Sequence, residues 1–541
     1  MIFLSTLFIS VLITIALTPL LSAVAIRNNL VDHPGGRKIH SHPIPRIGGI
    51  AMACGAFAPL LFWQFGDRFV VAFLSGAAVL VLFGLLDDLQ DLPPKVKFFG
   101  QILAALVVII GGGVHITSLG SLLPGVLHLP PALSIPLTLV AIIGATNAIN
   151  LADGLDGLAG GISLLIFAAL VCLSYLAGNQ IIGLISLAMV GVLFGFLRFN
   201  THPATIFMGD AGSQFLGFSA ATLAISLTQS APTMSPVLPL ILLGFPILDT
   251  LTVMVTRIAR KQSPFVADKN HFHHHLLALG LAQSESVLVI YLLQTLLVGV
   301  ALLLRYYSDW LLLLCYFGFS GTVLFLFNRA RSAHWRLKRL NPFHVRIAEQ
   351  LLTIKREGTL IRRVFPLFES GIPLLLLLTC GLAGSGPRYV SFATLFLALA
   401  IVVIRFWAPR LLEGVLRISL YLLVPFSVYL AETRPLLALE GLWRTSFNAL
   451  FGLFAVLILL ISKFSRRDGF KSSPMDFLII ILALVVPNLP DQRIQEYQIG
   501  VVAAKVIMLY FSYEVLLSEQ RGKINRIALS TVVGLLLLAL K

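Results

Sequence analysis

Apolar stretches of roughly fifteen to twenty-two residues recur along the whole chain, and short polar segments separate them. The stretches are continuous and lack the polar–apolar alternation of lipid-facing β-strands. A helix that crosses a membrane needs about 20 consecutive apolar residues, so each stretch predicts one helix. The first half of the chain predicts helices near residues 1–22, 48–65, 69–86, 98–113, 133–150, 158–177, 180–197, 212–228, 236–256, 286–304 and 309–328.

A second series of apolar stretches predicts further helices near residues 366–383, 389–405, 414–430, 446–462, 475–487, 498–516 and 526–540. The predicted fold class is therefore an all-α polytopic integral membrane protein, with about 11 transmembrane helices in the first half and about 7 in a C-terminal extension. The stretch between the two series contains ten Lys or Arg residues and only two acids. Three parts are predicted: a membrane-embedded domain (1–328), a basic amphipathic cytoplasmic linker (329–365) and a C-terminal transmembrane extension (366–541).

Composition supports the same conclusion. The 541 residues are 58% hydrophobic and 12% charged, whereas a soluble protein carries about 25% charged residues. The net charge of +15 does not indicate a nucleic-acid partner, because the basic residues lie in alternate loops, as the positive-inside rule describes for a protein in a lipid bilayer. Loops after the first, third and ninth helices are basic, which predicts that the N-terminus lies on the outer, periplasmic side of the membrane and that these loops lie in the cytoplasm.

The segment Asn147–Gly157 combines two amides, two carboxylates and two glycines at the end of an apolar run. An Asp at the centre of a bilayer costs about 2.5 to 3.5 kcal/mol, so acids in such a place indicate a function. The glycines permit the helix to end here, which would let Asn150, Asp153 and Asp156 converge. Their oxygens are hard ligands that suit Mg²⁺. Helix capping and loop solvation are the alternative.

Three further polar clusters share the predicted cytoplasmic face. Asp87 and Asp88 stand near Lys97, as a solvated loop or as groups that handle a metal and a proton. Asp210 lies at a helix start, where backbone N–H groups can hold phosphate or can simply be capped. The histidines at 271–275 predict either a zinc site or donors to a diphosphate. The Asp87 cluster also echoes the diphosphate–metal motif of prenyltransferases, but the second copy which that motif needs is missing.

These clusters occur in the order of one known family. The segments 32–49, 87–97, 147–157, 208–210 and 268–277 resemble the polyprenyl-phosphate N-acetylhexosamine-1-phosphate transferases, glycosyltransferase family 4, over residues 1–330. The resemblance is strongest to the bacterial undecaprenyl-phosphate N-acetylglucosaminyl 1-phosphate transferases. The phospho-N-acetylmuramoyl-pentapeptide transferases are similar, but less so around the histidines.

The resemblance implies that undecaprenyl phosphate attacks a UDP-N-acetyl sugar in the bacterial inner membrane. The products are a lipid diphosphate sugar and UMP, in the first membrane step of a cell-envelope polysaccharide. It implies Mg²⁺, with Mn²⁺ as the alternative, on Asn150 and Asp210. The residues that it implies for catalysis are Asp87, Asp88 and Asp210, and those for substrate binding are Lys38, Lys97, Asn147, Asp153, Asp156, His271, His273 and His274.

One residue departs from the pattern of that branch, which usually has an arginine where this chain has His275. Arginine is always charged and binds phosphate through two N–H groups, whereas histidine is only partly charged at pH 7. Diphosphate affinity or its pH dependence is therefore expected to differ.

A lipid-sugar transporter or flippase is the alternative from a different class. Such a protein would carry polar groups through the helix middles and on both faces, whereas the clusters here lie on one predicted face. The sequence leaves open which UDP-sugar is used and which polymer is built. It also leaves open the role of residues 366–541, and whether the chain forms a homodimer or binds downstream glycosyltransferases.

Overall fold

A computed structural model describes residues 2–28, 30–32, 43–122, 128–262, 271–333, 359–386, 388–436, 442–464, 499–519 and 524–541. These residues form two compact units that divide near residue 338. Among the described helices, eleven are long and apolar enough to cross a membrane, eight in the first unit and three in the second. The predicted all-α polytopic fold is confirmed.

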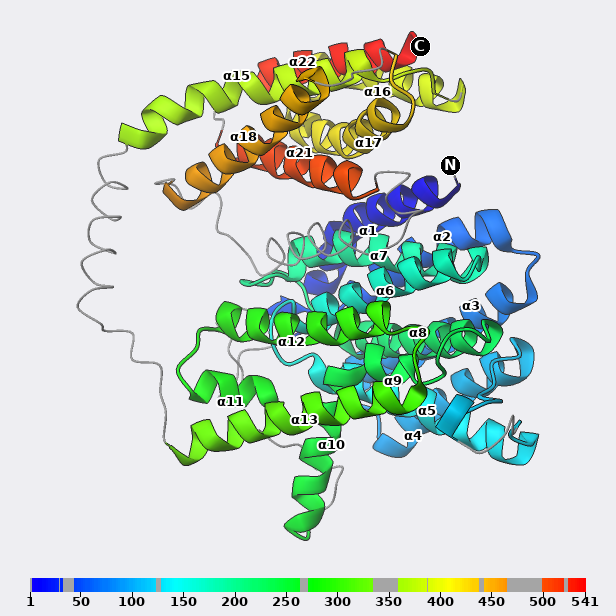
Figure 1. Cartoon of the computed structure of the whole chain (residues 1–541). Coiled ribbons are helices and arrows are strands. Elements are labelled where there is room, and N and C mark those ends of the chain that lie inside the picture. The colour runs from blue at the N-terminus through cyan, green and yellow to red at the C-terminus, as the bar shows by residue number, and fades with distance from the viewer. Residues whose placement is uncertain are drawn as a thin grey trace. The chain divides into compact units, whose positions relative to one another are not determined.

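The first unit contains, in chain order, α1 (Ile2–Arg27), β1 (Val31–Asp32), β2 (Ile44–Pro45), α2 (Gly48–Gln64), α3 (Arg68–Gln90), α4 (Pro94–Leu106) with a π-helical turn at Val107–Gly111, η2 (Gly120–Leu122), α5 (Pro131–Ala152), α6 (Leu158–Leu176), α7 (Gln180–Asn200), α8 (Gly209–Ser230), α9 (Leu238–Leu242), α10 (Gly244–Ala259), α11 (Phe272–Ala278), α12 (Gln283–Leu303) and α13 (Asp309–Ser332). In Figure 1, α10 runs across the direction of α12 and α13.

The prediction of a single helix at 236–256 is wrong, because the chain is divided there into α9 and α10. Pro246 has no N–H to donate to the carbonyl of Leu242 and so disfavours a continuous helix. The Leu242 carbonyl instead accepts a hydrogen bond from Nε2 of Gln294 on α12, at 2.7 Å. The partner helix thus satisfies a backbone group that the break leaves without one.

Other helices enclose α8 almost completely. Its polar serine, threonine and glutamine side chains are therefore buried within the protein. Small residues let the backbones approach closely, as in other membrane helix pairs. A Cβ added to Gly49 of α2 would lie 2.7 Å from Cα of Gly212, and one added to Gly217 would lie 2.7 Å from Cα of Thr146 on α5. These contacts seat the first turn of α8 against α2 and the following turns against α5.

The short antiparallel pair β1–β2, which the sequence pattern did not predict, anchors the chain before α8. The N–H of Phe207 donates to the carbonyl of Pro45 at 2.8 Å. The N–H groups of Gly48 and Gly49 in turn donate to the carbonyls of Phe207 and Met208, each at 2.9 Å. The segment that carries Asp210 is therefore joined by backbone bonds to the start of α2.

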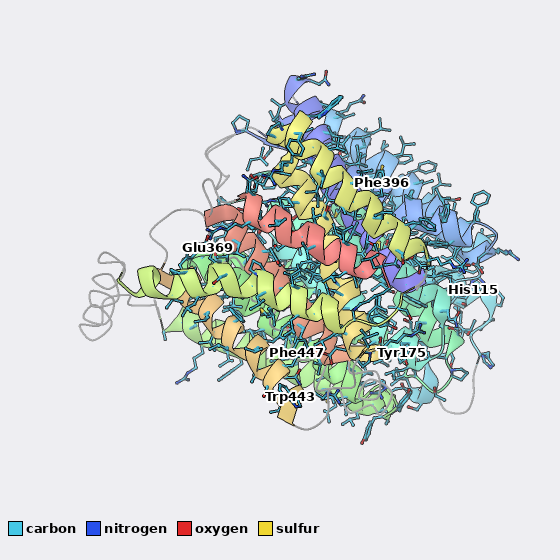
Figure 2. The ribbon with its side chains drawn as sticks, turned by 90° about the horizontal axis from the view of Figure 1, so that it is seen from above. His115, Tyr175, Glu369, Phe396, Trp443 and Phe447 are labelled. Atoms are coloured by element: carbon cyan, nitrogen blue, oxygen red, sulfur yellow. The ribbon has the colours of Figure 1, made fainter. Side chains whose placement is uncertain are left out.

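The second unit contains α15 (Thr359–Leu382), α16 (Arg388–Trp407), η3 (Pro409–Leu411), α17 (Leu412–Thr433), α18 (Leu442–Phe464), α21 (Ile499–Glu519) and α22 (Ile524–Ala539). Figure 2 labels Phe396 on α16 and Trp443 and Phe447 on α18. The helix predicted at 475–487 and most of the predicted linker lie outside the described residues. Helices α13 and α15 extend into both ends of that linker.

A buried ion pair joins two helices of the second unit. The ammonium group of Lys505 on α21 forms a salt bridge with Glu432 on α17, and both side chains are buried. The same ammonium lies 4.3 Å from the ring centre of Phe447 and 4.9 Å from that of Phe451, both on α18. One cation thus connects three helices in this unit.

Candidate functional site

The cytoplasmic ends predicted for three helices meet at one lysine. The ammonium group of Lys97, in the first turn of α4, forms salt bridges with Asp87 near the end of α3 and, at 3.4 Å, with Asp210 at the start of α8. Asp87 is buried, and its other oxygen accepts the N–H of Leu92 at 2.8 Å. The structure therefore brings Asp210 to Asp87 and Lys97, although 113 positions separate Lys97 from Asp210 in the sequence.

Asp88 has a different place from its neighbour. Its carboxylate accepts the backbone N–H groups of Asp210 at 3.0 Å and Ala211 at 3.2 Å, at the start of α8. Unpaired N–H groups at a helix start are normally satisfied in this way. Gly209 has a φ of 67°, and a Cβ added to it would lie 2.8 Å from Cγ of Asp88. Asp88 thus fixes the position of Asp210, and its predicted catalytic role stays a prediction.

The helix ends within the Asn147–Gly157 segment, as predicted from its glycines. Helix α5 stops at Ala152, and Gly157 has a φ of 79°, in the left-handed region that favours glycine. Asn147 lies within the last turns of α5, where its amide donates to Gln101 at 2.8 Å. Gln101 in turn donates to Gln214 of α8 at 3.1 Å. Three amide side chains therefore link α5, α4 and α8.

The other three polar residues of this segment have separate surroundings. Asn150 accepts a hydrogen bond of 2.6 Å from the hydroxyl of Ser213, one turn after Asp210. Asp156 lies 2.8 Å from Nδ1 of His202 and accepts the N–H of Ala204 at 3.1 Å. Burial, followed by the nearby charges of Asp88 and Asp156, raises the pKa of Asp153 to about 7.

The histidine segment contacts the turn that follows α5. His271 precedes α11 and contacts Asp249 of α10, and the rings of His271 and His273 are stacked. A Cβ added to Gly154 would lie 2.5 Å from Cε1 of His273, so the ring packs directly on the turn that carries Asp153. Burial, followed by the nearby charge of His274, lowers the pKa of His273 to about 3.

The side chains around Asp210 fit a hard divalent cation by their chemistry. Asp87, Asn150 and Asp210 offer carboxylate and amide oxygens, the donors that Mg²⁺ and Mn²⁺ accept. The Ser213 hydroxyl contacts Asn150 and also the carbonyl of Gly209, so Asn150 and the start of α8 share one neighbour. Among the described residues, no group of three or more His, Cys, Asp or Glu side chains is placed to hold a metal.

Comparison with known proteins identifies the family. The sequence profile described as glycosyl transferase family 4 matches residues 70–228. A probable undecaprenyl-phosphate N-acetylglucosaminyl 1-phosphate transferase of Bacillus subtilis is 38% identical over 311 residues, which are 57% of this chain and 87% of that protein. This chain belongs to glycosyl transferase family 4. The undecaprenyl-phosphate α-N-acetylglucosaminyl 1-phosphate transferase of Yersinia pestis is 32% identical over 58% of this chain and 88% of its own length.

The family match covers four of the polar residues that meet around α8, because Asp87, Lys97, Asn150 and Asp210 all lie within residues 70–228. The histidine segment lies beyond it. The matches to the Bacillus and Yersinia relatives are longer, at 311 and 326 residues, but each leaves more than two fifths of this chain uncovered. The resemblance inferred from the motifs is confirmed, and the C-terminal extension is an addition to the part shared with these relatives.

Several polar neighbours in this family member were not predicted from the sequence. Gln101 lies one helical turn after Lys97, and Ser213 lies one turn after Asp210, so helical spacing could have suggested both. An acid within an apolar helix is a recognisable signal, and it could have drawn attention to Asp249. Arg46 forms a salt bridge with Asp32, and its charge also acts on Asp88 and Asp153. Lys38 lies outside the described residues.

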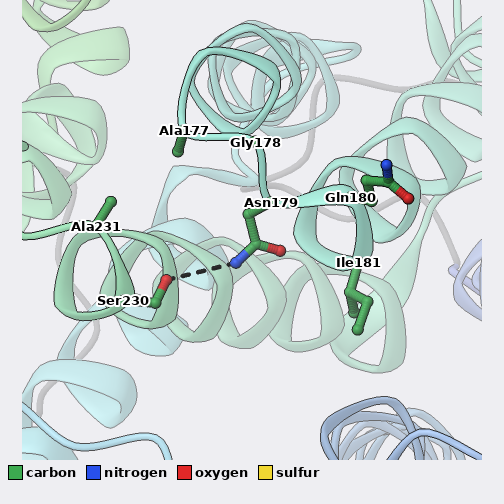
Figure 3. A pocket seen from close by; sticks show the side chains of 7 residues that line it. All are labelled: Ala177, Gly178, Asn179, Gln180, Ile181, Ser230 and Ala231. Atoms are coloured by element: carbon green, nitrogen blue, oxygen red, sulfur yellow. Dashed lines mark hydrogen bonds between the residues drawn. The ribbon is translucent and has the colours of Figure 1, made fainter.

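A cavity of about 430 Å³ lies at the opposite end of α8 from Asp210. It is lined by the loop from α6 to α7, by the first turn of α7 and by Ser230 and Ala231 at the end of α8 (Figure 3). Its lining residues are neutral, and Asn179 donates to the hydroxyl of Ser230 at 3.4 Å. Without a charged group, this cavity does not suit a nucleotide diphosphate.

Proposed function

We propose that this chain transfers N-acetylglucosamine 1-phosphate from UDP-N-acetylglucosamine to undecaprenyl phosphate and releases UMP. The Bacillus and Yersinia relatives are named for this lipid acceptor and this sugar, which supports both parts of the proposal. The observation that carries the proposal is the meeting of Asp87 and Asp210 at the ammonium of Lys97. A site for two phosphorylated substrates needs positive charge and oxygen ligands in one place, and the cluster of Lys97 with Asp87 and Asp210 supports this role.

In the proposed reaction, an oxygen of the lipid phosphate forms a bond to the β-phosphorus of the UDP-sugar. The bond from that phosphorus to the bridging oxygen breaks, and UMP leaves with the bridging oxygen. A phosphate monoester has a second pKa of about 6, so the lipid phosphate is mostly a dianion at neutral pH. It needs no base to remove a proton, and the role proposed for Asp87 is to orient Lys97.

The remaining predicted roles follow the contacts of each side chain. Asn150 and Asp210 would hold Mg²⁺, which neutralises charge on the diphosphate when bound. Lys97, His273 and His274 would contact diphosphate oxygens. Asn147, Asp153 and Asp156 would orient the nucleotide. Two of them already have partners: the amide of Asn147 donates to Gln101, and the carboxylate of Asp156 contacts His202 and the N–H of Ala204.

The protein is a multi-pass membrane protein, and its orientation is part of the proposal. We place it in the bacterial inner membrane with its N-terminus in the periplasm and the Asp87–Lys97–Asp210 cluster at the cytoplasmic surface. Basic loops after the first and third helices support this orientation through the positive-inside rule. It also suits the substrates, because UDP-sugars are cytosolic and the lipid phosphate can enter sideways from the bilayer.

The test uses membranes that carry the full-length chain, with radiolabelled UDP-N-acetylglucosamine, Mg²⁺ and undecaprenyl phosphate. We expect label that extracts into organic solvent, together with UMP. Asp210→Asn should abolish it, whereas Asp91→Asn should not, because Asp91 is an exposed residue in the left-handed conformation that Asn tolerates. If no UDP-N-acetylhexosamine gives extractable label, the proposal is wrong.

A further inference from the structure

Asp249 and His271 form a buried pair, and Asp249 has no role in the predicted reaction. Asp249 lies on α10 and is 4% exposed, and His271 precedes α11 and is 5% exposed. Oδ2 of Asp249 lies 3.0 Å from Nδ1 of His271, and Oδ1 accepts the N–H of Phe272 at 2.9 Å. One carboxylate therefore holds both the first histidine ring and the first backbone N–H of α11.

The pair determines where the rest of α11 lies. The ring of Phe272 packs between Phe245 of α10, with ring centres 5.6 Å apart, and Phe327 of α13, with ring centres 4.7 Å apart. The His271 ring stacks on His273, with ring centres 5.7 Å apart and planes 7° from parallel. Fixing His271 thus also fixes the ring of His273.

His273 extends this series of contacts to the Asn147–Gly157 segment. Its ring packs on Gly154, where an added Cβ would lie 2.5 Å from Cε1. Gly154 is not among the glycines with positive φ, so its lack of a side chain serves this contact rather than its backbone conformation. Asp249, His271, His273 and Gly154 therefore form a continuous path from α10 to the turn that carries Asp153.

We propose that Asp249 and His271 are positioning residues, which hold α11 so that His273 is seated against Gly154. The pair acts through His273 and does not touch the substrate, so this role replaces the direct substrate contact that the resemblance implies for His271. A carboxylate can only accept hydrogen bonds, so Nδ1 of His271 must carry the proton and donate it to Asp249 in both the neutral and the charged ring. Carboxylates orient metal-bound histidines in the same way. The proposal rests on the proposed function, because the histidines are expected at the diphosphate.

The experiment measures kcat and KM for UDP-N-acetylglucosamine in the full-length chain, per amount of folded protein. Asp249→Asn should lower kcat/KM by about ten- to a hundredfold, the range known for residues that orient metal-bound histidines. His271→Phe keeps a flat ring to stack on His273 but cannot bond to Asp249. It should lose about as much, and the double variant should lose no more than either single one, because the two residues act as one unit.

Asp309→Asn is the matched control. Asp309 is also a buried aspartate that accepts a backbone N–H, from Ser121 at 2.6 Å, but it is on α13 and outside the proposed site. Its variant should lower the melting temperature and leave KM unchanged. A loss of melting temperature in Asp249→Asn with kcat/KM unchanged would show a merely structural role and overturn the proposal.

Two further outcomes decide between positioning and direct contact. Losses that multiply in the double variant, or a His271→Phe loss far larger than that of Asp249→Asn, would show that His271 contacts the substrate itself. Gly154→Ala tests the same path from the exposed turn, where folding is less at risk, and should lower kcat/KM similarly; an unchanged value would overturn the proposal. If the wild-type chain transfers no sugar phosphate at all, it is the proposed function that fails.

Discussion

Replacing Gly84 with alanine should separate α3 from α8 and disable the site while leaving the fold intact. A Cβ added at Gly84 would lie 2.5 Å from the backbone nitrogen of Ala211, whereas ordinary contact begins at 3.4 Å. The neighbouring atoms are backbone, so they cannot move aside as a flexible side chain would. Relieving the clash requires the two helices to separate locally by at least about 0.9 Å, the difference between these distances, because Cα of Ala211 is nearer still.

That displacement falls on the residues that the site needs. Asp87 lies one turn after Gly84, and Asp210 immediately precedes Ala211. The bonds from Asp88 to the N–H groups of Asp210 and Ala211 are 3.0 and 3.2 Å long, and such a shift would stretch them beyond hydrogen-bonding range. A misplacement of about 1 Å can lower a rate by about 10²-fold, and overpacking costs about 1–3 kcal/mol of stability.

The assay compares transfer of labelled sugar phosphate by the wild type, Gly84→Ala and Gly144→Ala, each normalised to folded protein. Gly144 also lies within a helix, but a Cβ there would meet nothing within 4 Å. Alanine at Gly144 should therefore preserve activity and slightly raise stability, because glycine is a poor helix former. If Gly84→Ala retains at least half of the wild-type kcat, the close contact between α3 and α8 does not determine the site's geometry.

Three other outcomes are expected. Asp87→Asn should lower kcat by about 10²-fold or more at pH 7 with no recovery at pH 9, because Asp87 orients Lys97 rather than acting as a base. Below pH 6.5, the melting temperature of the wild type should fall more steeply than that of His273→Gln. Burial lowers the pKa of His273 to about 3, so between pH 6.5 and 3 the unfolded chain binds a proton at this histidine that the folded chain does not, and acid favours unfolding. Glu432→Gln should lower the free energy of unfolding by about 3–5 kcal/mol, because it leaves Lys505 as an uncompensated buried charge.

Each of these outcomes has a control and a contrary result. Full recovery of Asp87→Asn at pH 9 would establish a base. If the melting temperatures of the wild type and of His273→Gln fall equally with decreasing pH, His273 is not a buried neutral histidine. For the second unit, the exposed i,i+4 pair of Arg417 and Glu413 is the comparison, and Glu413→Gln should change stability by less than about 0.5 kcal/mol. Equal effects of the two glutamine variants would contradict the importance of burial.

The helices were predictable because long apolar runs have few alternatives in a bilayer, where every backbone polar group must be satisfied internally. The break before Gly244 was not predicted, although Pro246 marked it, because hydropathy alone does not register a missing N–H. The meeting of Asp87, Lys97 and Asp210 was foreseen only as a shared membrane face. Which atoms touch depends on how the helices are rotated and packed, and the apolar pattern leaves this open.

Two residues show why side-chain roles are harder to predict than helices. Asp88 follows Asp87 directly, but successive residues on a helix point about 100° apart, and its carboxylate reaches the start of α8 instead of Lys97. Asp249 stands 22 positions before His271 in an apolar run. Nothing in the local sequence joins them, because only the fold of α10 against α11 brings the two side chains together.

The close packing of α8 against its neighbouring helices restricts which amino-acid substitutions this protein can accept. Gly49, Gly84 and Gly217 press against its backbone or that of α5, so one extra methyl group at any of them would disturb the helix that carries Asp210. Packing and chemistry therefore cannot be altered independently in this part of the chain. Divergence toward a new sugar or lipid is expected to come from the loops around α8, such as residues 201–207, while the helix itself tolerates little variation.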